Sequence, residues 1–450
     1  MDFVKDKIRP LYFRYLAAAF GSALITSVYS IVDMAMVGQY QGPDGTAALA
    51  VVAPVWNIIY SLGLLTGIGG SVLFSTTRGK SGVSTGKENE YFTVSVIGSV
   101  ILAAAAWIAV LLFERELLTF FGATEELLPL AQDYLRPIRA VLPVFLLNQM
   151  LAAFLRSDGA PALATAGVLA GGIFNIFGDY IFVFPMNMGI YGAGLATAIG
   201  SCISLIVQLS HFFSKKNTLK LVRPSRFLHK ARKVFVTGFS TFFIDVAMGI
   251  LTILFNRQIV TYLSTDALSV YGVIINVSTF VQCCAYSVGQ ASQPIISVNF
   301  GAHLGGRIRE TLRYALGTVA FFALLWTVLC FAVPLLFIRI FMEPAAEITA
   351  IAPGIIRAYG LSFLLLPLNI FSTYYFQAIM KPAAAFVVSV SRGCVISGAL
   401  IFLLPAVFNP DSLWLAMPVT ELITAVYVIV TMYKNTRSLT DAVKQPQNSF

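Results

Sequence analysis

The chain has 450 residues, of which 58% are hydrophobic and only 11% are charged, and its formal net charge is +9. A typical soluble domain carries about 25% charged residues, so this composition excludes a soluble globular protein, a disordered chain and a disulfide scaffold. The mean hydropathy of +0.81 predicts an integral membrane protein with little mass outside the bilayer.

Apolar runs long enough to cross a bilayer as helices follow one another along the chain. A spanning helix needs roughly 20 apolar residues, whereas barrel strands would alternate with period two over about ten residues. We therefore predict an all-α integral membrane protein with twelve transmembrane helices. The runs cover residues 11–38, 46–77, 91–113, 128–155, 161–184, 189–213, 233–262, 266–300, 311–340, 350–379, 382–407 and 412–433.

The basic residues alternate between the two sides of the predicted membrane. If the N-terminus is cytoplasmic, most of the 30 Lys and Arg residues fall in cytoplasmic segments, as the positive-inside rule requires. We therefore expect both termini in the cytoplasm and a multi-pass protein of the cell (inner or plasma) membrane. The positive net charge is then explained by basic residues on the cytoplasmic side of the membrane. No nucleic-acid partner is expected.

The two halves of the chain resemble each other in sequence. A nearly constant shift aligns separated segments, and a shift of 221 residues places Asn148 on Asn369. Two parallel six-helix repeats are typical of one class of secondary transporter, which alternates access by rocking; the alternative is a duplication without functional meaning. The predicted domains are an N-lobe of residues 1–219, a basic cytoplasmic linker of residues 220–232 and a C-lobe of residues 233–450.

Acidic residues inside the predicted spans are the candidates for function: Asp33, Asp179, Asp245 and Glu421. A carboxylate at the bilayer centre costs at least ~2.5–3.5 kcal/mol on insertion scales, so such residues usually face a cavity and act in ion or proton relays. Asn175 precedes Asp179 by one helical turn and shares its helix face. Because Asp33 and Asp179 both fall in the outer half of their spans, we predict that they form a proton or sodium site.

Other polar residues are weaker candidates. Thr197, in the small-residue run GLATAIG, is expected to add an oxygen ligand to the site. Asn148, Asn369 and Asp245 are secondary candidates, and Arg257 is a candidate partner of Asp245. The alternative for each Asp is a packing role in which backbone amides or hydroxyls hold the carboxylate. The glycines of LGLLTGIGGS are expected to serve close helix packing.

The sequence contains no Gly-rich phosphate loop, HExxH or GxSxG motif. It therefore predicts neither an ATP-driven pump nor a hydrolase, and an ion gradient is left as the energy source. We expect no enzyme activity and no cofactor, with H⁺ or Na⁺ as the coupling ion. No metal is expected beyond a Na⁺ ion at Asp33, Asn175 and Asp179. Glu421, near the outer start of the last span, is expected to be an interface residue.

Several segments carry motifs in the order found in one transporter family. SIVDMAMVGQY contains a first-helix Asp, NIFGDYIF and MGIYGAGLATAIG occupy the fifth and sixth spans, and YYFQAIMKP ends the tenth. Together they resemble the multidrug and toxic compound extrusion (MATE) transporters over nearly the whole chain. The resemblance implies two six-helix lobes around a central cavity. It also implies an N-lobe cation site at Asp33, Asn175, Asp179 and Thr197.

The tenth span contains no acid, so the chain looks more like the DinF-like branch of that family. The first span lacks the proline at which relatives often bend. The resemblance implies a secondary active antiporter that exports amphipathic, often cationic small molecules in exchange for H⁺ or Na⁺. We expect a monomer in the lipid bilayer. The alternatives are a lipid-linked oligosaccharide flippase of the same superfamily and an uncoupled channel or scaffold.

Overall fold

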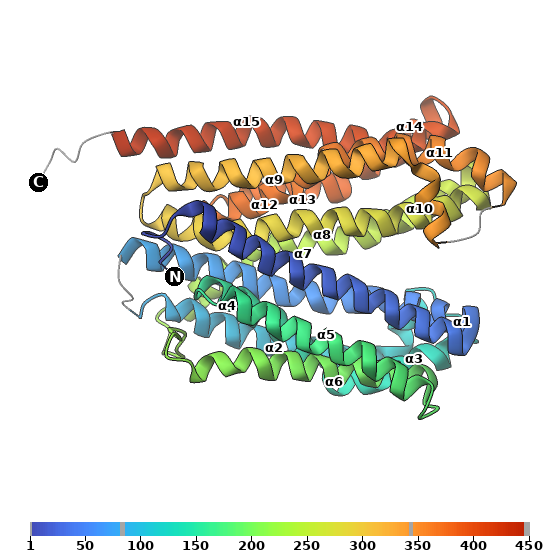
Figure 1. Cartoon of the computed structure of the whole chain (residues 1–450), viewed down its shortest axis with the longest axis horizontal. Helices are drawn as coiled ribbons and strands as arrows, with labels where there is room; N and C mark the ends of the chain where they lie inside the picture. The colour runs from blue at the N-terminus through green and yellow to red at the C-terminus, as the bar shows by residue number, and fades with distance from the viewer. Residues whose placement is uncertain (1, 82–85, 342–344, 445–450) are drawn as a thin grey trace, which may run out of the picture. The chain divides into compact units, whose positions relative to one another are not determined.

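The computed structural model describes residues 2–81, 86–341 and 345–444, and the regular secondary structure in these ranges is helical. Figure 1 follows the helices from α1 in blue to α15 in red. The first six are α1 (Ile8–Ser81), α2 (Asn89–Phe120), α3 (Leu128–Ala140), α4 (Leu142–Ser157), α5 (Pro161–Val183) and α6 (Gly189–Leu209). They are followed by α7 (Phe227–Tyr262), α8 (Thr265–Gly301), α9 (Gly305–Ala332), α10 (Pro334–Phe341), α11 (Ala346–Gly360), α12 (Leu366–Ala378), α13 (Pro382–Val390), α14 (Ile396–Val407) and α15 (Ala416–Lys444).

Helix α1 contains two of the predicted spans. A straight helix of its 74 residues would be about 110 Å long, several times the roughly 30 Å of a hydrocarbon core. Gly42 breaks the helix with dihedrals of φ 69° and ψ −156°, and Pro43 follows it. Glycine tolerates this left-handed φ because it has no Cβ. The break lies between the predicted runs 11–38 and 46–77.

The other spans follow the predicted runs, although some are broken. Ten helices are long and apolar enough to cross a bilayer, and the pair α3 and α4, bent by 60°, adds an eleventh. Because α1 contains two spans, the described residues form twelve spans, the number that the sequence predicts. The fourth and tenth spans each break just before a proline, Pro143 and Pro367 respectively. A proline lacks the N–H that would continue the preceding helix.

The chain divides into two compact units whose boundaries differ from the predicted lobes. The first consists chiefly of Ala17–Phe242, and the second holds Phe3–Leu16 together with Phe243–Phe450. The beginning of α7 therefore belongs to the first unit. There a Cβ added to Gly238 would lie 1.9 Å from the carbonyl oxygen of Leu65. Only a glycine permits this approach, so the first unit extends beyond residue 219.

The second unit includes the first turns of α1. The Tyr12 hydroxyl donates to Thr318 Oγ1 at 3.0 Å. The carbonyl oxygen of Phe3 accepts from Asn299 Nδ2 at 3.1 Å and from Arg307 at 2.9 Å. Because these bonds join buried or half-buried groups of sequentially distant segments, no apolar pattern in the sequence could have located this boundary.

The internal repeat is visible in equivalent hydrogen bonds within each unit. Asn148 Nδ2 donates to the carbonyl oxygen of Ser201 at 2.9 Å, and Asn369 Nδ2 donates to the carbonyl oxygen of Glu421 at 2.9 Å. Each bond joins the fourth span of a repeat to its sixth. A helical carbonyl oxygen has a second lone pair and can accept such a bond without breaking its helix, so the two asparagines join the equivalent pair of helices in both units.

Candidate functional site

Asp33, in the first span, is buried beside a tyrosine from α3. Its side chain is 8% exposed, and the Tyr134 hydroxyl donates to Asp33 Oδ2 at 2.7 Å. Asp33 Oδ1 accepts no hydrogen bond from any described residue. One carboxylate oxygen of Asp33 thus accepts a hydrogen bond from a neutral donor, and the other is available for another partner.

Asp179 on α5 is completely buried. Neither of its carboxylate oxygens has a hydrogen-bond partner among the described residues. Asp33 lies close enough to Asp179 for a direct electrostatic interaction, so the structure brings together the two carboxylates that the sequence singled out. Two neighbouring carboxylates without a cation between them are a costly arrangement in a low-dielectric interior.

The small residues of α5 explain how the helices approach closely enough to form this site. A Cβ on Gly172 would lie 2.9 Å from Ile25 of α1, and a Cβ on Gly171 would lie 2.4 Å from the carbonyl oxygen of Gly200 on α6. Helices α5 and α6 run side by side (Figure 1). Small residues at such crossings let helix backbones approach closely within a membrane.

Asn175 and Thr197 join α5 to α6 one turn from Asp179. Asn175 Nδ2 donates to Thr197 Oγ1 at 2.9 Å, while Asn175 Oδ1 is buried without a partner in the described chain. Together with the free oxygens of Asp33 and Asp179, it makes a group of acceptor oxygens without donors. Oxygen acceptors of this kind are the ligands that hard cations prefer, and a carboxylate can equally take a proton.

Tyr134 belongs to this site and was missed by the sequence reasoning. It stands within LAQDYLRPIR, with Asp133 before it and Leu135 after it. Nothing in that pattern distinguishes a tyrosine that contacts Asp33 from one that packs against lipid headgroups. Its contact with Asp33 joins residues 101 positions apart, and such a contact cannot be read from local sequence.

Glu421 is part of a buried cluster in the second unit, so the expectation that it is an interface residue is wrong. It is fully buried, and its carboxylate accepts from Arg392 Nε at 2.8 Å and from Asn369 Nδ2 at 2.6 Å. Arg392 is itself buried and stands on a short π-helical turn, Ser391–Val395. The ion pair cancels the charge that would otherwise keep Glu421 at a surface.

Each remaining candidate has at least one local partner, although Asp245 Oδ2 is buried without a hydrogen-bond partner among the described residues. Tyr286 donates to Asp245 Oδ1 at 3.3 Å, whereas Arg257 is exposed and makes no ion pair with Asp245 in the described structure. Asn148 accepts from Gln208 Nε2 at 3.2 Å in addition to its bond to Ser201. Asn148 and Asn369 therefore contact neighbouring helices, and neither is hydrogen-bonded to Asp33 or Asp179 in the described structure.

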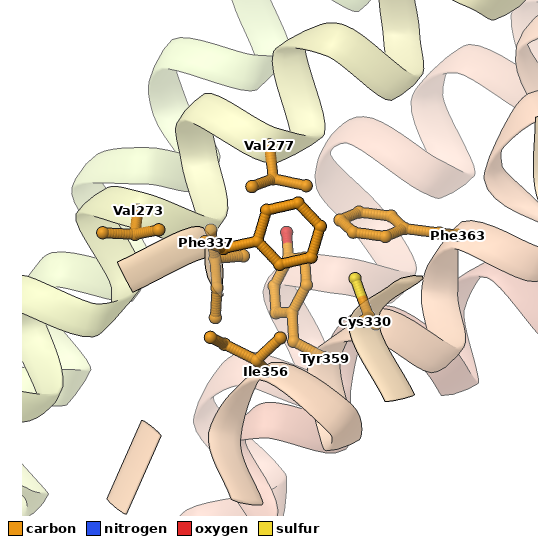
Figure 2. Close-up of a pocket in the computed structure, with 9 residues that line it drawn as sticks. Val273, Val277, Cys330, Phe337, Ile356, Tyr359 and Phe363 are labelled. Atoms are coloured by element: carbon orange, nitrogen blue, oxygen red, sulfur yellow. The ribbon is translucent and has the colours of Figure 1, made fainter. Parts of the chain in front are cut away.

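A small apolar pocket lies in the second unit (Figure 2). It holds about 220 Å³ of empty space. Its walls come from α8, α9, α10 and α11 and the short turn that follows α11, and they contain one hydroxyl and one thiol but no carboxylate or basic group. The pocket offers no ligands for a cation. The lining residues are Val273, Ile274, Val277, Cys330, Phe337, Ile356, Tyr359, Gly360 and Phe363.

Comparison with protein families finds one matching model. A family model described as MatE matches residues 18–181 and again residues 241–403. One match lies in each half of the chain, which agrees with the repeat. The multidrug export protein MepA of Staphylococcus saprophyticus is 24% identical over 415 residues, which are 91% of this chain and 90% of that protein. MepA of Staphylococcus aureus is 23% identical over 414 residues, with the same coverage.

Solved structures share the fold at low sequence identity. An outward-facing MATE family transporter of the MOP superfamily has a TM-score of 0.88 at 17% identity and covers 98% of both chains. A MOP superfamily transporter from Pyrococcus furiosus has a TM-score of 0.89 at 18% identity, covering 97% of this chain and 98% of its own. The chain therefore has the two-lobe helical fold of these proteins.

Proposed function

The chain belongs to the MatE family, and from this premise we propose that it is an antiporter that exports amphipathic, often cationic small molecules in exchange for protons or sodium ions. Family membership makes it a multi-pass protein of the cell membrane and a transporter rather than an enzyme. The 23–24% identical MepA proteins are multidrug exporters, and they support the proposed substrate class.

The observation that carries the coupling proposal is the group of unsatisfied acceptor oxygens in the first unit. Buried polar groups in proteins are almost always hydrogen-bonded. Here Asp33, Asn175 and Asp179 present acceptors with no donor in the described structure. A proton on a carboxylate or a sodium ion between the oxygens would supply the missing partner. We infer that this group, with Thr197 holding the Asn175 amide, is the coupling site.

The proposed cycle uses the charge of the site as the coupling element. An inward cation gains roughly 2.3 kcal/mol per 100 mV of membrane potential. When the cation binds, it offsets one of the two negative charges of Asp33 and Asp179 and favours close packing of the first span against α5. When it leaves, the pair regains its full negative charge and favours an organic cation. Occupancy by one cation thus opposes occupancy by the other, which is the requirement for antiport.

The structure supports export of cations over transfer of a lipid-linked sugar. A site for pyrophosphate would need accessible basic side chains within the spans. Arg392 is buried and its Nε is engaged by Glu421. The residues that the structure leaves without partners near the first-unit site are acceptors, and acceptors attract cations.

Dye efflux from everted vesicles tests the coupling site. We expect Asp33→Asn and Asp179→Asn each to reduce ion-driven efflux by at least about tenfold. Each substitution removes a carboxylate whose negative charge binds the coupling cation. Asp133→Asn, which alters an exposed acid on α3 next to Tyr134, is the matched control and should keep the wild-type rate. A proton gradient and a sodium gradient are imposed separately in each variant.

The outcomes separate the proposed functions. Efflux driven by one gradient and lost in both variants supports the coupling site and identifies the ion. Full efflux in both variants would refute coupling at Asp33 and Asp179. Dye movement that follows only the dye's own gradient, with either ion, would show a channel.

A further inference from the structure

A basic segment connects α6 to α7 in the first unit. The chain contains no Asp or Glu between Asp179 and Asp245. Because α6 and α7 are both spanning helices, the segment between them must lie at a membrane surface. Seven basic side chains of this segment and of the first two turns of α7 are exposed: Lys215, Lys216, Lys220, Arg223, Arg226, Arg232 and Lys233.

Polar side chains from α2 fix the backbone of this segment. Asn89 Nδ2 donates to the carbonyl oxygen of Thr218 at 3.0 Å, and Asn89 Oδ1 accepts from the Lys220 amide at 3.0 Å. Thr93 Oγ1 accepts from the Val222 amide at 2.9 Å. These bonds use main-chain groups, so they hold the backbone in place and leave the basic side chains pointing to solvent.

The acids nearest to the segment are already neutralised. Glu90 pairs with Lys230 and accepts from Ser225 Oγ at 2.7 Å. Asp158 is paired with Arg78 at 3.0 Å and with His211 at 2.7 Å. The exposed lysines and arginines therefore keep their full positive charge for an external partner.

Large apolar side chains stand exposed among the basic ones. Phe213 is 93% exposed, Leu221 is 69% exposed and Leu228 is 81% exposed. Cationic side chains beside exposed Phe and Leu are the combination that binds the headgroup region of a membrane, where charges meet phosphates and apolar groups enter the acyl boundary.

We propose that residues 213–233 form a binding surface for anionic phospholipid headgroups. Charge complementarity indicates the bound partner, because the surface presents basic and apolar side chains where the chain meets the membrane surface. The acids Glu90 and Asp158 beside it are paired. The fixed backbone arranges the cations in advance, so that several can contact one cluster of headgroups. Each basic residue near an anionic membrane contributes on the order of fivefold in binding.

Lipid titration of the purified full-length protein in detergent tests the proposal. Fluorescent phosphatidylglycerol and phosphatidylcholine are titrated separately. We expect the wild type to prefer phosphatidylglycerol by at least about tenfold, since several cations act together. The variant Lys215→Gln, Lys216→Gln, Arg223→Gln, Arg232→Gln should lose at least about tenfold in phosphatidylglycerol affinity, with phosphatidylcholine binding unchanged.

Two further variants serve as controls. Arg9→Gln, Arg14→Gln, Arg313→Gln, Lys434→Gln removes the same charge from exposed positions in the second unit and should keep the preference within about threefold, because it leaves every cation of the proposed surface in place. Lys215→Arg, Lys216→Arg, Arg223→Lys, Arg232→Lys keeps the charge and should bind as wild type does. This second control shows that the positions tolerate substitution.

Three results would overturn the proposal. The first is a wild type with no preference for phosphatidylglycerol. The second is an equal loss in both Gln variants, which would mean that any exposed cation serves. The third is displacement of phosphatidylglycerol by an equal concentration of glycerol 1-phosphate, which would identify a soluble anion as the ligand.

Discussion

At the scale of single residues, Tyr134 distinguishes a coupling role of Asp33 from a packing role. Its hydroxyl donates to Asp33 Oδ2 at 2.7 Å, and a hydrogen bond to a charged group contributes about 1.5–3 kcal/mol. We expect Tyr134→Phe to lower ion-driven efflux by about tenfold or more, since the bond matters most when Asp33 is ionised. Efflux of a fluorescent dye from everted vesicles measures this change.

A second tyrosine provides the matched control. Tyr40 also donates to a side chain, Asn187 Oδ1, at 2.5 Å, but in an exposed position. Tyr40→Phe should leave the efflux rate within about twofold, because exposed hydrogen bonds exchange readily with water. Equal rates in the two Phe variants would contradict a role of Tyr134 in coupling.

The buried ion pair of Arg392 and Glu421 is expected to matter for stability. Removing one partner of a buried pair costs about 3–5 kcal/mol, because the other charge stays buried without compensation. We therefore expect Glu421→Gln to lower the melting temperature of the purified protein markedly. Thermal unfolding followed by size-exclusion chromatography measures the change.

An exposed ion pair gives the comparison for this prediction. Arg115 and Glu125 are 3.0 Å apart with side chains 63% and 82% exposed, and such pairs contribute about 0–1 kcal/mol. Glu125→Gln should leave the melting temperature almost unchanged. An equally small effect of Glu421→Gln would show that the buried pair does not hold the second unit together.

The residues also show where sequence reasoning failed. A carboxylate inside an apolar run is conspicuous, so Asp33 and Asp179 could be selected without a structure. The partner of Glu421 could not be identified, since Arg392 lies 29 positions away on another helix. Burial of a charge depends on such a partner, and distance along the chain carries no information about it.

At the scale of helices, the glycines of α5 determine how closely it approaches its neighbours. A Cβ on Gly171 would lie 2.4 Å from the carbonyl oxygen of Gly200, and overpacking of this kind costs about 1–3 kcal/mol. We expect Gly171→Ala to lower the melting temperature and to reduce efflux, because it separates α5 from α6 near Asn175 and Thr197. Both are measured on the same preparation.

Gly272 on α8 is the matched control for that substitution. A Cβ there meets no atom within 4 Å, and alanine is about 0.8–1 kcal/mol better than glycine inside a helix. Gly272→Ala should therefore keep or raise the melting temperature. Loss of stability in both alanine variants would show that helix flexibility, not close packing, is the requirement.

The positions of the spanning helices could be predicted from the sequence better than the points at which these helices break. Continuous apolar runs locate the spans because the bilayer imposes both length and apolarity. The π-helical turn at Ser391–Val395 and the 60° bend between α3 and α4 depend on packing against other helices. The run 311–340 likewise proved to be two helices, α9 and α10, that separate at Val333 just before Pro334.

At the scale of the whole molecule, the two repeats share one fold, and the proposed function depends on residues in which the two repeats differ. Both units keep an asparagine that binds a carbonyl oxygen of the sixth span. The buried acids differ in their pairing: Glu421 is paired with a cation in the second unit, whereas Asp33 and Asp179 in the first, like Asp245 in the second, have no cationic partner among the described residues. The duplication was predictable from residue offsets, but this difference in pairing was not.

That divergence leads to opposite stability effects of neutralising the acids. Asp179 is fully buried with both oxygens unsatisfied, and a buried charge without a partner costs several kcal/mol, more than a neutral amide. We therefore expect Asp179→Asn to keep or raise the melting temperature while it abolishes coupled efflux, whereas Glu421→Gln lowers the melting temperature. Such a trade of stability for activity is typical of functional sites. A fall in melting temperature for Asp179→Asn as large as that for Glu421→Gln would mean that Asp179 is held by its surroundings as a packing residue, and the coupling site would have to lie elsewhere.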